Sequence, residues 1–203
     1  MDYKRVKLGC YGANVSMSVV GNLPPLLFLT FRSLYGISYT FLGALVVVNF
    51  ATQLIIDLIF SFFSNKFNIS KTVKMMPLIC CIGLAIYGVS PWLFPGNVPL
   101  CLLIGTIIFS ASAGLAEVLI SPVVAAIPSE DPDREMSKVH SVYAWGTVAV
   151  ILISTLFLLF VGADYWQFLC LFFIIVPLFS FASFSGTELP EMATPEKVSG
   201  ALE

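Results

Sequence analysis

Charge is what this 203-residue sequence has least of, since only 11% of its residues are Asp, Glu, Lys or Arg. Soluble domains carry about 25% charged residues. With 58% hydrophobic residues, the chain cannot cover a water-facing surface, which excludes a soluble enzyme, a secreted domain and a disordered chain. Ten basic residues against twelve acidic ones give a net charge of −2, so the basic excess typical of nucleic-acid binding is absent.

Patterns that bind metals or form disulfides are missing as well. The sequence has one histidine and five cysteines, with no C-x-x-C pair, and the odd number argues against a disulfide framework. All five cysteines lie in or beside apolar runs, where a thiol behaves as a small hydrophobic side chain. We therefore expect neither a cofactor nor a metal site.

What the sequence does contain is six apolar runs of membrane-spanning length, since a helix needs about 20 apolar residues to cross a bilayer. We predict an all-α, polytopic transmembrane bundle whose six helices lie near residues 8–32, 39–64, 72–93, 98–127, 138–161 and 165–186. This domain is expected to cover residues 1–190. A flexible cytoplasmic tail or linker, 187–203, follows because that segment is rich in Pro, Glu and small residues.

The basic residues predict the orientation. Nine of the ten fall on one side of the expected membrane, namely Lys4, Arg5, Lys7, Lys66, Lys71, Lys74, Arg134, Lys138 and Lys197, and Arg32 falls on the other. The positive-inside rule then predicts a multi-pass protein of the cell membrane, or inner membrane, with both termini in the cytoplasm. Trp92, Tyr165 and Trp166 are expected at the outer interface, where amphipathic rings settle.

Polar residues concentrate on four of the six predicted helices, at steps that place them on one helix face. They are Asn14, Ser18 and Asn22; Asn49, Gln53 and Asp57; Ser110, Glu117 and Ser121; and His140, Tyr143 and Trp145. We expect these four helices to face a polar cavity and the apolar helices 72–93 and 165–186 to be outermost. Because the pattern of two polar helices and one apolar helix occurs twice, it predicts two inverted three-helix repeats. The serines and asparagines have an alternative role in holding helices together.

Glu117 and Asp57 are harder to explain by packing, because carboxyl groups inside a membrane are costly and usually functional. Glu117 lies ten residues before the expected end of its helix, ~15 Å from the cytoplasmic side. Desolvation there disfavours the ionised form, so this group is predicted to load and release protons near neutral pH. The alternatives are a permanently protonated, hydrogen-bonded Glu117 and, for Asp57, a hydrogen-bond anchor at a helix end.

Three further residues on helix 138–161 have open roles. His140 is a candidate for a proton relay or gate, or a ring at the membrane interface. Tyr143 and Trp145 are candidates for stacking on a substrate ring, which would suit a sugar, and core packing is the alternative.

The segment from Glu117 to Gly146 reads EVLISPVVAAIPSEDPDREMSKVHSVYAWG. It has a Glu five residues before a Pro, a Pro-Glu-type loop, and a polar run that ends in aromatic-Gly. In these features it resembles the major facilitator superfamily, and within it the fucose-permease-like branch. The loop SFFSNKFNISK, 61–71, resembles the superfamily motif G-x-L-a-D-R-x-G-R-K, with Lys66 in place of the Arg and Asn65 in place of the Asp. The stretch that begins N-L-P-P-L-L at Asn22 resembles the first helix, without that branch's acid.

The resemblance implies one six-helix half of a two-half carrier, in which Glu117 lines the central cavity and takes part in proton coupling. Asp57, Asn65 and Lys66 would then have gating or structural roles. We predict a secondary active transporter, or its N-terminal half, that moves a small solute such as a sugar by proton symport and alternating access. Its expected partners are the solute, protons, the bilayer, and a second half or an identical subunit of a homodimer. A channel or another membrane bundle is the alternative. An intramembrane enzyme is least favoured, since SASAGL, 110–115, lacks a G-x-S-x nucleophile.

Overall fold

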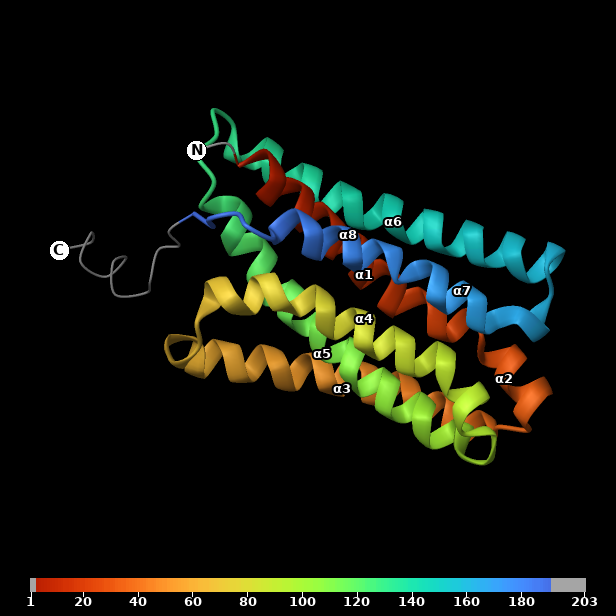
Figure 1. Ribbon diagram of the computed structural model, residues 1–203. Coiled ribbons are helices and arrows are strands. Elements are labelled where there is room, and N and C mark those ends of the chain that lie inside the picture. The colour runs from red at the N-terminus through yellow and green to blue at the C-terminus, as the bar shows by residue number, and fades with distance from the viewer. Residues whose placement is uncertain (1–2, 191–203) are drawn as a thin grey trace.

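The computed structural model describes residues 3–190, and no strand occurs within that range. Its helices are α1 Lys4–Leu26, α2 Phe28–Tyr35, α3 Tyr39–Phe63, α4 Ile69–Leu93, α5 Val98–Ala125, α6 Pro132–Phe160, α7 Trp166–Phe173 and α8 Ile175–Phe184 (Figure 1). Five helical segments are long and apolar enough to cross a membrane, and the bent pair α1–α2 adds a sixth if it is one span. This confirms the all-α class and is compatible with a multi-pass membrane protein. Most of the expected tail, 191–203, and Lys197 with it, lies outside the described residues.

Helix starts follow from capping side chains. Ser38 Oγ accepts a hydrogen bond from the Phe41 N–H at the start of α3, and Asn68 Oδ1 accepts one from Lys71 N–H at the start of α4. Asp131 caps α6 in the same way, and the following proline suits the first turn of a helix. As a result α6 begins at Pro132, six residues before the expected start, although its first two turns are highly charged.

Two spans are broken near proline residues, which lack an N–H and clash with the carbonyl group four residues earlier. Pro24 and Pro25 precede the break at Leu27, where α1 and α2 meet at a bend of 44°. Pro177 opposes the carbonyl group of Phe173, the last residue of α7. The predicted helices 8–32 and 165–186 are therefore each two helices in the structure.

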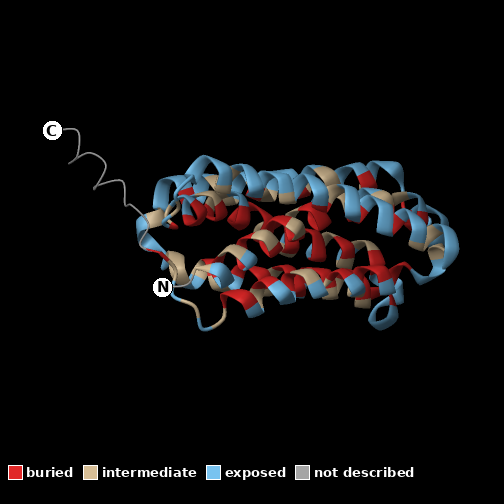
Figure 2. Cartoon of the chain, turned by 90° about the horizontal axis from the view of Figure 1, so that it is seen from above, coloured by how far each residue is buried: buried red, intermediate tan, exposed pale blue. Residues whose placement is uncertain are grey.

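The helices form two layers. α6, α1 and the α7–α8 span lie on one side of the bundle, and α3, α5 and α4 lie on the other (Figure 1). α1 packs against α5, and α4 packs against α7 and α8, which joins the layers. Buried stretches face the middle of the bundle and exposed stretches its periphery (Figure 2). We call the end that holds the start of α1 and the loops after α3 and α5 the basic end, because eight Lys and Arg residues lie there (Lys4, Arg5, Lys7, Lys66, Lys71, Lys74, Arg134 and Lys138).

Helices 72–93 and 165–186 are not the most exposed helices of the chain itself, and their outermost position in the membrane stays a prediction. In the most apolar window of α4 and of the α7–α8 span, 50% and 44% of the residues are buried, against 17% in α3 and in α6. Apolar side chains do not distinguish lipid from a neighbouring helix, whereas small residues allow helices to approach closely. Gly83 of α4 lies against the backbone of Phe109, and Gly12 of α1 lies against Ser180 of α8.

Trp166 also differs from its predicted place at the membrane interface. Its side chain is fully buried and packs edge-to-face on Phe31, with the ring centroids 4.8 Å apart. The indole N–H donates to Tyr35 Oη at 3.2 Å, which satisfies the polar end of the ring inside the core. Trp92 and Tyr165 are about half exposed, as residues at an interface would be.

Candidate functional site

An open groove of about 590 Å³ lies between α1, α3, α5 and α6. Its lining includes eight polar residues that the sequence singled out: Asn14, Asn22, Gln53, Asp57, Glu117, Ser121, His140 and Tyr143. These four helices are the ones whose polar stripes were expected to face one cavity, and none of the lining residues comes from α4, α7 or α8. The structure thus brings together residues that are up to 129 positions apart, from Asn14 to Tyr143.

The two carboxyl groups of the groove come from facing helices. Glu117 lies eight residues before the end of α5 at Ala125, and Asp57 lies six residues before the end of α3 at Phe63. These positions are ~12 Å and ~9 Å from the basic end of the bundle, so Glu117 lies nearer that end than the sequence predicted. The two groups are close enough for their charges to interact. Asp57 Oδ1 is shielded from solvent and has no hydrogen-bond partner among the described residues, so no hydrogen bond supports a role as a helix-end anchor.

Three amide side chains of the groove point their nitrogen atoms toward protein acceptors. Asn14 Nδ2 donates to the Cys10 carbonyl at 3.1 Å, and Asn22 Nδ2 donates to the Ser18 carbonyl at 2.8 Å. Gln53 Nε2 donates to Asn49 Oδ1 at 2.8 Å. Each of these amide groups keeps its oxygen as an acceptor and its second N–H as a donor.

Asn49, Ser110 and Ser18 lie beside the groove and hold its walls together, as in the packing alternative. Ser110 Oγ donates to Asn49 Oδ1 across the contact between α5 and α3, at 2.5 Å. Ser18 Oγ donates to the Tyr143 carbonyl at 2.8 Å and so connects α1 to α6. None of the three lines the groove.

Tyr143 and Trp145 do not form a shared stacking platform. Tyr143 lines the polar groove, whereas Trp145 lines a separate apolar groove between α1 and α6 and is 73% exposed. Positions two residues apart point to opposite sides of a helix, so one ligand ring cannot lie between these two side chains. His140 lies on the same side of α6 as Tyr143 and lines the polar groove.

Of the three residues expected to have gating or structural roles, Asp57 lines the groove, whereas Asn65 and Lys66 lie apart from it. Asn65 and Lys66 are exposed in the turn Ser64–Lys66 after α3, and Lys66 Nζ lies 5.0 Å from the centre of the Phe63 ring. The connections at the basic end are instead made by residues that the sequence did not single out for this role. Glu135 pairs with Lys7 at 2.8 Å and with Lys138 at 2.6 Å. Glu135 and Lys138 are three residues apart on one helix, which predicts that they meet. No local pattern predicts that Glu135 also pairs with Lys7 of α1.

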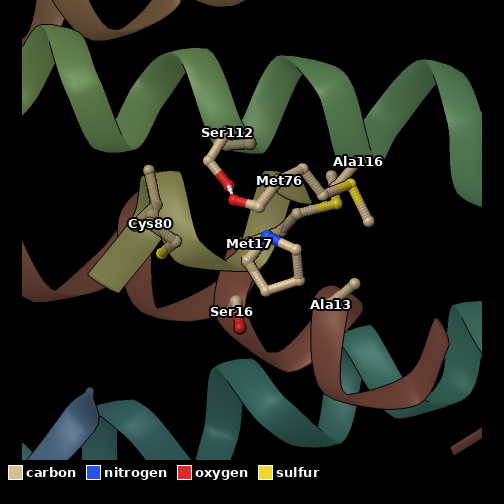
Figure 3. A pocket seen from close by; sticks show the side chains of 10 residues that line it. Ala13, Ser16, Met17, Met76, Cys80, Ser112 and Ala116 are labelled. Carbon is tan, nitrogen blue, oxygen red and sulfur yellow. Dashed lines mark hydrogen bonds between the residues drawn. The ribbon is translucent and has the colours of Figure 1, made fainter. Parts of the chain in front are cut away.

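A third, much smaller space lies in the core between α1, α4 and α5 (Figure 3). It measures about 10 Å³. Ser112 Oγ donates to the Met76 carbonyl at 2.6 Å on its wall. A space of this size holds at most about one water molecule, so we regard the open groove as the candidate site.

Metal-ligating side chains do not gather in the described part of the chain, since no three His, Cys, Asp or Glu side chains there could hold one ion. The five cysteines are free, and four of them are buried. No protein-family model matches the sequence, and no curated protein matches it either.

Proposed function

We propose that this chain is a secondary active transporter, or its N-terminal half, that moves a small solute by alternating access. One observation carries this proposal: three membrane-length helices and α1 of the bent α1–α2 pair surround a groove with two carboxyl groups at similar depth. Carboxyl groups at such depths usually belong to substrate or proton pathways rather than to packing. An open groove of this volume also falls within the ~300–1,000 Å³ of small-molecule sites.

The helix contacts support two inverted three-helix repeats, α1–α3–α4 and α5–α6–α7/α8. α3 packs against α5 as α6 packs against α1, and α4 packs against α5 as α7/α8 packs against α1. If the helices of the first segment are replaced by the corresponding helices of the second, and the reverse, each of these contacts becomes another one of them. Repeats related by a two-fold axis require this correspondence. Such repeats form one half of a major-facilitator fold, in agreement with the resemblance of the segment 117–146.

A second half would complete the site. The groove is open, and its two flanking helices α3 and α6 have large exposed apolar side chains, among them Val47, Phe50, Ile151 and Leu152. A second six-helix half, or an identical subunit, would cover these side chains and close the groove into a central cavity. The positive-inside rule places the basic end and both chain termini in the cytoplasm.

Within this transporter Glu117 is the proton-coupling residue. It lies on the groove wall with Asp57, and no hydrogen bond or ion pair with the described residues holds it in one protonation state. His140 and Tyr143 line the same groove from α6. A group of this kind can exchange a proton with whichever side of the membrane the groove faces.

The test is transport by the assembled protein in liposomes loaded with a pH-sensitive dye. Solutes are screened for proton movement coupled to uptake. Glu117→Gln should then abolish uphill, proton-driven uptake and leave counterflow of the same solute intact, because Gln keeps the shape of a protonated Glu but cannot titrate. Glu130→Gln, an exposed loop acid, is the matched control and should behave as wild type. Intact uphill uptake by Glu117→Gln would remove this residue from proton coupling.

A further inference from the structure

We propose that the groove between α1, α3, α5 and α6 selects an organic cation, a primary or secondary ammonium carried on an apolar body. This inference rests on the proposed transport function and adds the class of substrate. It follows from the charge of the groove wall, from the hydrogen-bonding atoms that face the groove, and from the rings beside them.

The charge of the groove is one-sided. Asp57 and Glu117 line it, and no lysine or arginine does. Arg134 and Lys138 lie nearest along α6, but they line the separate groove that holds Trp145. Among the described residues, His140 is the one titratable basic side chain that lines the polar groove. An anion in the polar groove would meet two carboxyl groups and no lysine or arginine, whereas an ionised carboxyl group would attract an ammonium group.

The neutral groups of the groove add to this preference. Asn14, Asn22 and Gln53 each use one amide N–H on a protein oxygen, so each keeps its amide oxygen and a second N–H for a ligand. An ammonium group has only donors, so it can bond to these amide oxygens and to the two carboxyl groups. The Tyr143–Trp145 pair that was expected to stack on a sugar ring does not share this groove, since Trp145 lies on the other side of α6.

Aromatic rings lie where the apolar body of the ligand would be. Phe50 of α3 is 63% exposed and Tyr143 of α6 is 39% exposed, and both line the groove. Their faces attract cations and their rings cover apolar surface. The groove volume of about 590 Å³ leaves space for a one-ring or two-ring amine.

Three probes of nearly equal shape test the charge preference: phenethylamine as the cation, 2-phenylethanol as the neutral compound and 3-phenylpropanoate as the anion. Their binding to the purified full chain in lipid nanodiscs at pH 7 is measured by isothermal titration calorimetry. Phenethylamine should bind at least tenfold more tightly than 2-phenylethanol, and 3-phenylpropanoate most weakly. Equal affinity for the three probes, or preference for the neutral or anionic probe, would overturn the inference.

Variants then assign the preference to the groove. Asp57→Asn should reduce the ratio of cation to neutral affinity about tenfold or more, while 2-phenylethanol binding stays unchanged, which also shows that the variant is folded. Glu130→Gln and Asp164→Asn, exposed acids in loops outside the groove, should keep the wild-type ratio. A ratio that falls equally in Asp57→Asn and in both control variants would refute the assignment to this groove.

Measurements of binding and of transport distinguish the proposed transport function from the proposed cation site. Charge-selective binding of phenethylamine without any transport by an assembled protein would remove the transporter proposal and keep the cation site. Transport of a neutral or anionic solute, with no binding of phenethylamine, would keep the transporter and overturn the cation site.

Discussion

Gly83 shows how one absent side chain sets the distance between two helices. A Cβ atom at this position would lie 2.5 Å from the backbone nitrogen of Phe109 and 2.7 Å from its Cβ atom. Backbone atoms cannot rotate away as a flexible side chain can. Gly105 makes the reciprocal approach from α5, where an added Cβ would lie 3.1 Å from the Gly83 carbonyl oxygen. Close contact between α4 and α5 therefore depends on these two glycines.

Gly83→Ala is expected to destabilise the protein by about 1–3 kcal/mol, because overpacking forces backbone shifts. Thermal unfolding in detergent micelles, followed by circular dichroism, measures the effect. Gly43→Ala is the matched control, since nothing lies within 4 Å of the added Cβ on α3. It should leave the melting temperature unchanged or raise it slightly, because alanine favours a helix over glycine by roughly 0.5–1 kcal/mol. Equal loss in both variants would exclude the α4–α5 contact as the cause.

At the scale of the helical element, the sequence was sufficient to predict that each spanning helix exists and approximately which residues it covers. Apolar runs of about 20 residues are a strong signal, and each predicted range overlaps one helix or one broken pair. The charged start of α6 at Pro132 was missed because hydropathy favoured a loop, although Asp131 and Pro132 together form a recognisable helix start. The proline breaks at Leu27 and Ile174 were equally open to prediction from Pro24, Pro25 and Pro177.

The partners of each element were less predictable. Polar periodicity correctly indicated that α1, α3, α5 and α6 share a groove, because a helix face is a local property. Which apolar faces meet another helix is decided by distant residues such as Gly12 and Ser180. For the same reason hydropathy could not show that Trp166 lies in the core or that Ser110 donates a hydrogen bond to Asn49.

At the scale of the whole molecule, the helix ends should separate into two chemically distinct sides of a membrane. Gly96 lies in the turn Pro95–Asn97 at one end, and Asp133 lies in the first turn of α6 at the basic end. A membrane-impermeant maleimide applied to intact cells should label Gly96→Cys and should not label Asp133→Cys until the membrane is permeabilised. The unmodified chain gives the background, since four of its five cysteines are buried. The reverse labelling pattern would invert the proposed orientation.

A second copy of the chain, if it completes the cavity, must approach in one geometry. A two-fold axis along the membrane normal through the open groove places α3 of one copy against α6 of the other. Val47 lies eight residues after the start of α3, and Ile151 lies nine residues before the end of α6, so both are at a depth of ~12–14 Å from the same end. Both side chains are exposed, at 67% and 40%. This geometry predicts that the two positions meet between copies.

The double variant Val47→Cys with Ile151→Cys should therefore form disulfide-linked dimers under mild oxidation in membranes, detected by gel mobility with and without reductant. Each single variant should stay largely monomeric, because a two-fold axis through the groove keeps Val47 away from Val47 of the other copy and Ile151 away from its equivalent. The pair Ile82→Cys with Ile151→Cys is the matched control, since Ile82 is 54% exposed on α4, a helix that does not line the groove. Cross-linking of the control pair to the same extent would indicate random collision in the membrane. A double variant that stays monomeric, while still binding phenethylamine, would exclude an identical subunit as the second half and leave a different six-helix half to cover α3 and α6.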